Sequence, residues 1–169
     1  VLGFLKKEYG LVAWFDINGK LHVGKANDVK GETVKYVLRE NVISDNELKY
    51  QLAEDVKLKV KAVCYYKDGT KIEGELGEDG GETRTFYYYD VKDAAELKTL
   101  AQEELKRYSF DGYRGKITTF LLPYALPGMV ASIEDKVYNE RSGDYFIESV
   151  ETSFGTGGGR RTVEIGIKA

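Results

Sequence analysis

The sequence predicts an α+β fold that is mostly antiparallel β, in which a barrel or closed sandwich carries one packed helix. Three observations support this fold class. Several short segments alternate apolar and polar residues, as strands with one buried face do. Asn-Gly, Asp-Gly and glycine-rich stretches separate these segments, as hairpin turns would. One internal segment, residues 93–108, instead has a helical apolar stripe behind a helix start signal.

Residues 1–30 are predicted to be a separate, truncated element, made of a helix stump and a β-hairpin. Leu2 to Tyr9 has helical apolar spacing, and Gly10 follows it as the residue type expected just past a helix C-terminus. Because no capping residue precedes the segment, we expect it to be the end of a longer helix. The first residue is Val1 and not Met, which indicates a fragment or a processed chain.

The hairpin of this element is predicted from its turn. Leu11–Ile17 and Lys20–Gly24 have the character of strands, and Asn18-Gly19 joins them. This pair is preferred in two-residue turns because both residues tolerate a positive φ. We therefore expect a tight two-residue turn at Asn18-Gly19.

Residues 31–169 are predicted to form one barrel-like domain. Its clearest strand is Lys57–Tyr66, where apolar residues alternate with lysines, so that one face is buried. Asp68-Gly69 and later polar residues lead into Thr70–Leu76 and Thr83–Tyr89, which gives a three-stranded meander. Four later strands complete the barrel: Arg114–Leu121, Val130–Asp135, Asp144–Phe154 and Arg160–Ala169.

The helix at 93–108 and the last strand supply the candidate core. Asp93 and Glu96 have the spacing of a capping box. We expect the apolar stripe of the helix to pack on the sheet, with the alternating last strand beneath or beside it. The residues expected to form this structural core are Leu97, Leu100, Ala101, Leu105, Val163, Ile165 and Ile167.

The strand that begins at Asp144 differs from the others because neither of its faces is simply polar. Its apolar residues point to both sides: Phe146, Val150 and Phe154 to one, Tyr145 and Ile147 to the other. We expect both faces to be covered, either by internal packing or by a neighbouring subunit. The stretch Gly155–Gly159 is expected to turn this strand into the last one.

Composition and charge exclude several classes of protein. The net charge of −3 and the sequence pI of about 5.4 argue against a basic nucleic-acid binder. The single cysteine, Cys64, has no cysteine with which to form an internal disulfide, and the sequence contains no cysteine–histidine spacing of a metal site. No apolar run approaches the roughly 20 residues of a membrane-spanning helix, so no membrane partner is expected.

Residues that could carry chemistry have simpler structural interpretations. Gly155–Arg161 is similar to a phosphate-binding loop, but the residues after it alternate like a strand and do not begin a helix. A flexible hairpin tip is therefore favoured there. His22 lies in the hairpin without a motif partner for a nucleophilic triad. Cys64 lies on the apolar face of its strand, which favours a buried small hydrophobe over a nucleophile.

Carboxylate pairs also favour solvated positions over a glycosidase site. Glu134 and Asp135 are adjacent in a strand and point to opposite faces, as do Glu148 and Glu151. The sequence therefore assigns no catalytic residue, no metal ligand and no cofactor-binding residue. The chain is predicted not to be an enzyme and to use no cofactor.

Aromatic runs leave one alternative function open. Tyr65-Tyr66 and Phe86–Tyr89 could stack on sugars or bases, and with Trp14 they would form the exposed platform of a carbohydrate-binding module. Alternation places neighbouring aromatics on opposite faces of a strand. The favoured interpretation is that they fill both sides of a covered sheet or an intersubunit surface.

Several segments, in the same order, resemble a known family. Leu5–Asp16 through Gly19–Gly24 resembles the helix-to-hairpin passage of bacteriophage late control protein D, the baseplate hub of contractile tails. Asn41–Ser44 before Leu48–Tyr50 is similar to the entry into that family's second barrel, and Val56–Cys64 to the strand after it. Further similar segments are Asp93–Leu105, Gly112–Thr119, Pro127–Ile133, Gly143–Val150 and Arg160–Gly166.

The resemblance covers nearly the whole chain, but the family's first barrel is absent, so we expect a C-terminal portion of a hub. It implies a tail-tube-like β-barrel and a virion structural protein of a phage, a prophage or another contractile injection system. Hubs of this family form trimers whose chains each carry two tube-like barrels. Three chains thus imitate a six-fold ring and join the hexameric tail tube to the trimeric spike. The hub part of type VI secretion spike proteins is related.

The implied partners are other copies of the chain, as a trimer when full length, together with tail tube and spike proteins. DNA would pass through the lumen without specific binding, which an acidic wall favours. The implied localisation is the virion tail baseplate, after assembly in the bacterial cytoplasm. Exposed strand edges could pair with neighbouring subunits and close a ring.

Overall fold

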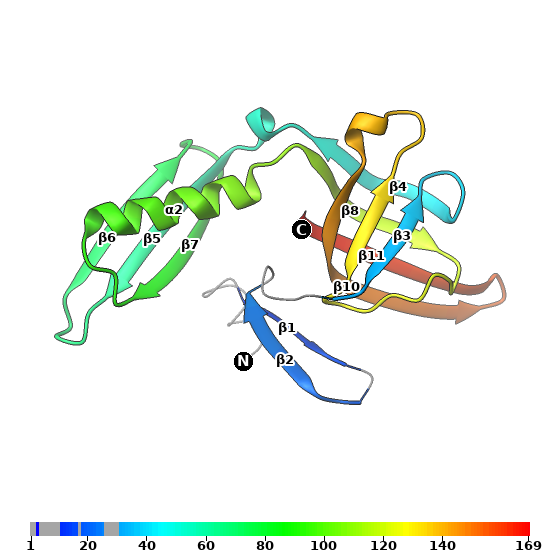
Figure 1. Cartoon of the computed structure of the whole chain (residues 1–169), viewed down its shortest axis with the longest axis horizontal. Coiled ribbons are helices and arrows are strands. Elements are labelled where there is room, and N and C mark those ends of the chain that lie inside the picture. Colours follow the sequence, from blue (N-terminus) through cyan, green and yellow to red (C-terminus); the bar gives the residue numbers. More distant parts are fainter. Residues whose placement is uncertain (1–2, 4–10, 17, 26–30) are drawn as a thin grey trace. The chain divides into compact units, whose positions relative to one another are not determined.

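The computed structural model describes residue 3 and residues 11–16, 18–25 and 31–169 (Figure 1). Its described elements are mostly strands, with one α-helix and two short 3-10 helices, Ala53–Asp55 and Asn139–Arg141. The predicted α+β class with mostly antiparallel strands is confirmed. No described helix is long and apolar enough to cross a membrane. The predicted helix at 2–9 lies outside the described residues, apart from Gly3.

The chain divides into two compact units. The main unit comprises Val12–Gln51 and Asp111–Ala169, and the inserted unit comprises Leu52–Phe110, with which Gly3 and Leu11 are grouped. This division differs from the predicted one, in which 31–169 form a single barrel-like domain. The physical reason is that Gln51 and Gly112 are paired neighbours in adjacent strands, so the chain leaves and re-enters the main sheet at one place.

A curled six-stranded sheet forms most of the main unit (Figure 1). The strands lie in the order β3-β9-β10-β11-β8-β4, and only the β3–β9 pair is parallel. The sheet has the form of half a barrel, with β3 and β4 as its end strands. The bounds are β3 Thr33–Val37, β4 Val42–Gln51, β8 Gly112–Thr119, β9 Val130–Glu134, β10 Gly143–Gly155 and β11 Gly158–Lys168.

A paired irregularity explains why three consecutive residues of β10 are buried. The β10–β11 register shifts on either side of Ile147, first by an extra residue in β11 and then by one in β10. Tyr145, Phe146 and Ile147 are all buried as a result. Both faces of β10 are thus covered there, whereas its later residues, from Glu148 on, are mostly exposed.

The inserted unit is a three-stranded sheet with one helix. Its strands are β5 Leu58–Tyr65, β6 Lys71–Gly77 and β7 Glu82–Tyr89, in the order β6-β5-β7, and the helix is α2 Ala94–Tyr108. The predicted meander is wrong, because β7 pairs with β5 in parallel and not with β6.

Two glycines make this crossover possible. The segment after β6 passes over the start of β5, where Glu78 N–H donates to the Leu58 carbonyl and Glu82 N–H to that of Lys57. A Cβ at Gly77 or at Gly81 would overlap with these same carbonyl oxygens. The polar, glycine-rich composition that predicts a hairpin loop is therefore the composition that a close crossing requires.

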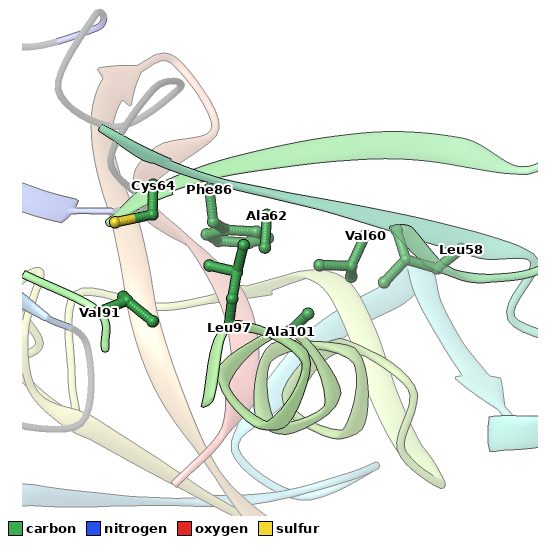
Figure 2. Packing of buried hydrophobic residues seen from close by; sticks show 8 residues of the cluster. All are labelled: Leu58, Val60, Ala62, Cys64, Phe86, Val91, Leu97 and Ala101. Carbon is green, nitrogen blue, oxygen red and sulfur yellow. The ribbon is translucent and has the colours of Figure 1, made fainter. Parts of the chain in front are cut away.

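Helix α2 begins and packs as its sequence pattern predicts, but on a different sheet. The Asp93 carboxylate accepts hydrogen bonds from the N–H groups of Ala95 and Glu96, while Glu96 reaches back to Lys92 N–H. The helix contacts β5 and β6. Figure 2 shows the core cluster that the helix forms with β5, with β7 and with the segment after β7: Leu58, Val60, Ala62, Cys64, Phe86, Val91, Leu97 and Ala101.

The predicted N-terminal hairpin is present as β1 Leu11–Phe15 and β2 Leu21–Lys25, which pair with each other. Its turn is not the expected two-residue turn. Asp16 N–H donates to the Lys20 carbonyl and Gly19 N–H to that of Asp16, with a positive φ at Gly19 and not at Asn18. This pattern is a longer loop closed by a glycine bulge, which the Asp16 carboxylate also stabilises by accepting from Asn18 and Lys20.

Candidate assembly surface

Cys64 and His22, which could act as a nucleophile or a base, are not part of a catalytic arrangement in the described residues. Cys64 is fully buried in the core of the inserted unit. His22 does have a partner that the sequence pattern does not show: its Nε2 lies 3.1 Å from Asp16 Oδ2, and its ring stacks on Trp14. The described residues contain no group of three or more His, Cys, Asp or Glu side chains that could hold a metal ion.

Asp135 corrects the prediction of solvated carboxylates, because its side chain is only 1% exposed. Its Oδ2 accepts a 2.6 Å hydrogen bond from Tyr113 Oη. Its Oδ1 accepts from Arg39 Nη1 at 3.0 Å and from the N–H groups of Val137 and Tyr138. Alternation places a side chain on a face but says nothing about which loops close over that face, so the sequence could not reveal this burial.

The electrostatics of Asp135 follow from these donors. Burial by itself would raise the pKa of Asp135, but the bonds from Tyr113, Val137, Arg39 and Tyr138 lower that pKa to about 2. Burial and the same bond raise the pKa of Tyr113. The cluster thus holds a permanent carboxylate that orients the loop after β9, and it offers no free acid or base.

The other three carboxylates are placed at the surface. Glu134 forms an ion pair with Lys35 of the neighbouring strand β3 at 2.5 Å. Glu148 and Glu151 are exposed on β10. Asp135 is thus the buried member of the four, and both of its oxygens accept hydrogen bonds from donors.

The seven residues predicted to form one core lie in two different units. In α2, Leu97 and Ala101 are buried, and Leu100 and Leu105 pack partly buried against the same cluster. The strand partners lie in β11 of the main unit, where all three are buried: Val163, Ile165 and Ile167. The helix stripe therefore packs on β5 and β6, and not on the last strand as expected, because the insertion gives α2 a sheet of its own.

The aromatic residues are divided between the two units and, in the inserted unit, between the two faces of its sheet. One face of the Trp14 indole stacks on His22 with ring centroids 5.2 Å apart, and its benzo ring contacts Gly128. Phe86 and Tyr88 point into the core of the inserted unit. On the opposite face of that sheet, three tyrosines gather: Tyr65, Tyr87 and Tyr89.

The surface that stands out is the outer part of the β10–β11 hairpin, residues 148–160, which we call the arm. β9 pairs with β10 only over Gly143–Phe146, and β8 pairs with β11 only up to Arg161. The two strands therefore continue past their neighbours, as Figure 1 shows for the orange and red strands. The predicted hairpin is present, closed by the pair Gly155–Gly158.

The arm is bordered by the segment 120–125, which we call the strap. Arg161, itself buried, donates from Nη1 to the carbonyls of Leu121 and Pro123 and lies 4.9 Å over the Tyr124 ring. The side chain of Leu121 fills the place that a Cβ at Gly159 would occupy. The strap is thus held by one arginine and one glycine that the sequence suggested only as part of a polar hairpin tip.

Large apolar side chains remain exposed around the arm and strap. Leu122 is 75% exposed, Phe154 is 76% exposed, Phe120 is 59% exposed and Tyr124 is 50% exposed. Arg160 lies over the Phe120 ring at 5.0 Å. Aromatic and arginine side chains of this kind are enriched at protein interfaces, so this region is the candidate assembly surface.

Comparison with known proteins gives the fold and its context. No protein-family model and no curated protein sequence matches the chain. Among solved structures, the chain is similar to the 43 kDa tail protein of prophage MuSo2 from Shewanella oneidensis, with 13% identity and a TM-score of 0.53. This similarity covers 93% of the chain and 50% of that protein.

Two further structures are similar over almost the whole chain. A tail protein from Neisseria meningitidis MC58 has 16% identity and a TM-score of 0.53, with 95% of this chain and 51% of that one covered. A chain in the virion of a native gene transfer agent particle has 11% identity and a TM-score of 0.56, with 98% and 37% covered. At these identities the likeness shows a shared fold. The chain spans about half or less of these proteins and has the fold of that part of them.

Proposed function

We propose that this chain is a structural part of a phage or prophage-derived tail, in the baseplate hub that joins the hexameric tail tube to the trimeric spike. The observation that carries the proposal is the likeness of 93–98% of the chain to two tail proteins and a virion particle. The resemblance to late control protein D, with segments in the same order, supports the hub in particular.

The architecture suits assembly better than catalysis. The curled main sheet ends in β3 and β4, and no further strand pairs with either of them in the part of the chain that the structure describes. A half-barrel that does not close on itself leaves room for neighbouring subunits to complete the ring. The polar cluster around Asp135 supplies a fixed loop and no reactive group.

The hub proposal includes its partners and place. Three full-length chains would form a pseudo-six-fold ring, contacting tail tube proteins on one side and the spike on the other. The net charge of −3 would let DNA pass through the lumen without specific binding. The protein would lie in the virion tail baseplate after assembly in the bacterial cytoplasm.

Electron microscopy of the full-length protein tests the proposal. We expect three-fold particles whose rings show six similar lobes, and stable complexes when the tail tube protein of the same tail is added. Strictly monomeric particles over the whole accessible concentration range, with no binding to the tube or the spike protein, would contradict the hub. Binding to a tube protein without a three-fold ring would contradict the hub stoichiometry alone.

A further inference from the structure

The outer edge of the arm is open. Beyond Ile147, whose N–H and carbonyl still bond to Met129 and Gly128, no strand in the described residues lies beside β10 on the side away from β11. The open edge runs from Ser149 to Gly155, and nearly all of its residues are exposed. A row of strand N–H and C=O groups without a neighbour is a template for a further strand.

The register of the hairpin fixes which backbone groups face outward. Gly155 and Gly158 flank the turn and form a bonded pair, and bonded and non-bonded pairs alternate from there. Glu151 and Ser153 therefore direct their backbone groups to β11. Val150, Thr152 and Phe154 direct theirs to the open edge.

Other edges of the main sheet have features that disfavour pairing with a further strand, and the arm lacks these features. β3 is only five residues long and carries Lys35, and β4 has two register irregularities and charged residues along it. The segment 149–155 contains no proline and no lysine, and its single charge is Glu151. Its outward residues Val150, Thr152 and Phe154 have high β propensity.

We propose that this edge binds the same edge of a second copy of the chain, antiparallel about a two-fold axis at Thr152. The axis follows from the length of the edge, because Thr152 is the midpoint of 149–155. Val150 then lies opposite Phe154 of the second copy, and Thr152 opposite Thr152. These are favourable cross-strand pairs, and Glu151 meets an uncharged Ser153. The proposal is independent of the tail function.

The contact is small, which sets its strength. Three outward residues on each copy form about six backbone hydrogen bonds. The buried area is below that of a stable dimer, although Phe154 adds an apolar side chain that is 76% exposed in the single chain. We expect a dissociation constant of roughly 10 µM to 1 mM.

Analytical ultracentrifugation of the chain from about 10 µM to about 1 mM tests the proposal. The average mass is expected to rise from 19.0 kDa towards twice that value. Thr152→Pro removes an outward N–H that the hairpin itself does not use, so it should abolish the rise and leave the fold intact. Thr152→Val keeps the N–H and should associate like the wild type.

A second pair of variants tests the register. Ser153→Glu places a carboxylate opposite Glu151 of the second copy and should weaken association roughly two- to tenfold, while Ser153→Lys should strengthen it by a similar factor. Within the chain, Ser153 lies opposite Arg160, which attracts a glutamate at position 153 and repels a lysine there. If the variants acted only through the stability of the hairpin, Ser153→Glu would therefore associate more strongly than Ser153→Lys.

Three outcomes would overturn the proposal: a wild-type chain that stays at 19.0 kDa throughout, Pro and Val variants that associate alike, or the reverse order of the Ser153 variants. Hydrogen exchange gives an independent readout. The amides of Val150, Thr152 and Phe154 should become protected as concentration rises. Unchanged exchange in a sample that dimerises would place the contact elsewhere and would also overturn it.

Discussion

The main unit and the inserted unit are both sheets with a buried face, but they bury different chemistry. The main unit encloses polar side chains, among them Asp135, Tyr113, Thr119 and Arg161. The core cluster of the inserted unit is apolar, from Leu58 to Ala101, and the buried charge of this unit is Glu104 of α2, which pairs with Arg107. Other charges of this unit lie on the outer face of the sheet, where lysines of β5 pair with glutamates of β6 at distances of 2.8–3.3 Å.

The difference follows from which segments each unit has to hold in place. A helix on a three-stranded sheet is specified by apolar burial, which is not directional. The main unit must hold long loops over an open sheet, and directional bonds do this. Asp135 orients the loop after β9 and Arg161 holds the strap. Each cluster stabilises the fold only while all its members remain, since a buried charge that loses its partner is costly.

The largest expected effect is the loss of Asp135. Asp135→Ala leaves Tyr113 and Arg39 without their shared acceptor and should lower the free energy of unfolding of the main unit by about 3 to 5 kcal/mol. Trp14 is the single tryptophan and lies in the main unit, so urea unfolding followed by its fluorescence measures the loss.

Its neighbour provides the control. Glu134→Ala removes an exposed ion pair with Lys35 and should change stability by at most about 1 kcal/mol. Equal losses for the two variants would mean that the Asp135 cluster does not hold the main unit.

The next effect belongs to the inserted unit alone. Leu97→Ala removes a fully buried side chain and should destabilise that unit by about 2 to 5 kcal/mol. Cys64 is the single cysteine and is buried in the same core, so the rate of thiol labelling reports its opening. Labelling should accelerate while the unfolding of Trp14 stays unchanged.

Leu100→Ala sharpens this test, because Leu100 is only partly buried and should cost less than Leu97. If Leu97→Ala shifted the Trp14 transition as far as it accelerated Cys64 labelling, the two units would not be separate cores.

The periodic part of the fold could be predicted from the sequence, because alternation and capping act within a few residues. The strand now seen as Leu58–Tyr65 and the helix behind Asp93 follow from such local patterns. The insertion could not be predicted, since Gln51 and Gly112 are neighbours only through the pairing of β4 and β8. No change of composition marks either boundary.

The candidate site was less accessible to sequence reasoning, for two reasons. Hydrogen bonds between distant residues carry no local pattern: Asp135 joins Arg39, which lies 96 positions away and has a positive φ of 68°. The strand β10, which carries the arm, is in contrast predictable from its apolar residues. Only the pairing of β10 with β9 and with the segment before β9 shows that its neighbour on this side ends at Ile147.

Acid should lower the stability of the main unit relative to that of the inserted unit, by less than the core substitutions do. The pKa of Asp135 in the folded protein is about 2, below its ordinary value of 3.8, so its stabilisation is complete above pH 3.8 and is lost as pH falls through 2. This loss is about 2 kcal/mol for the main unit. Stability followed by Trp14 between pH 5 and pH 2 measures it.

Asp135→Asn is the control for this acid effect, because it cannot titrate. The variant should be less stable at neutral pH, and the difference from wild type should shrink towards low pH. A difference that stays constant with pH would show that Asp135 is not the group responsible.

The smallest expected effect is at the start of α2. Asp93→Ala removes the acceptor for the N–H groups of Ala95 and Glu96 and should cost the inserted unit about 1 kcal/mol. This is roughly a fivefold faster labelling of Cys64. Lys98→Ala, on the exposed side of the same helix, should leave the rate nearly unchanged. Equal rates in Asp93→Ala and the wild type would mean that the helix start opens without exposing Cys64, so that the cap and the apolar core are not one cooperative unit.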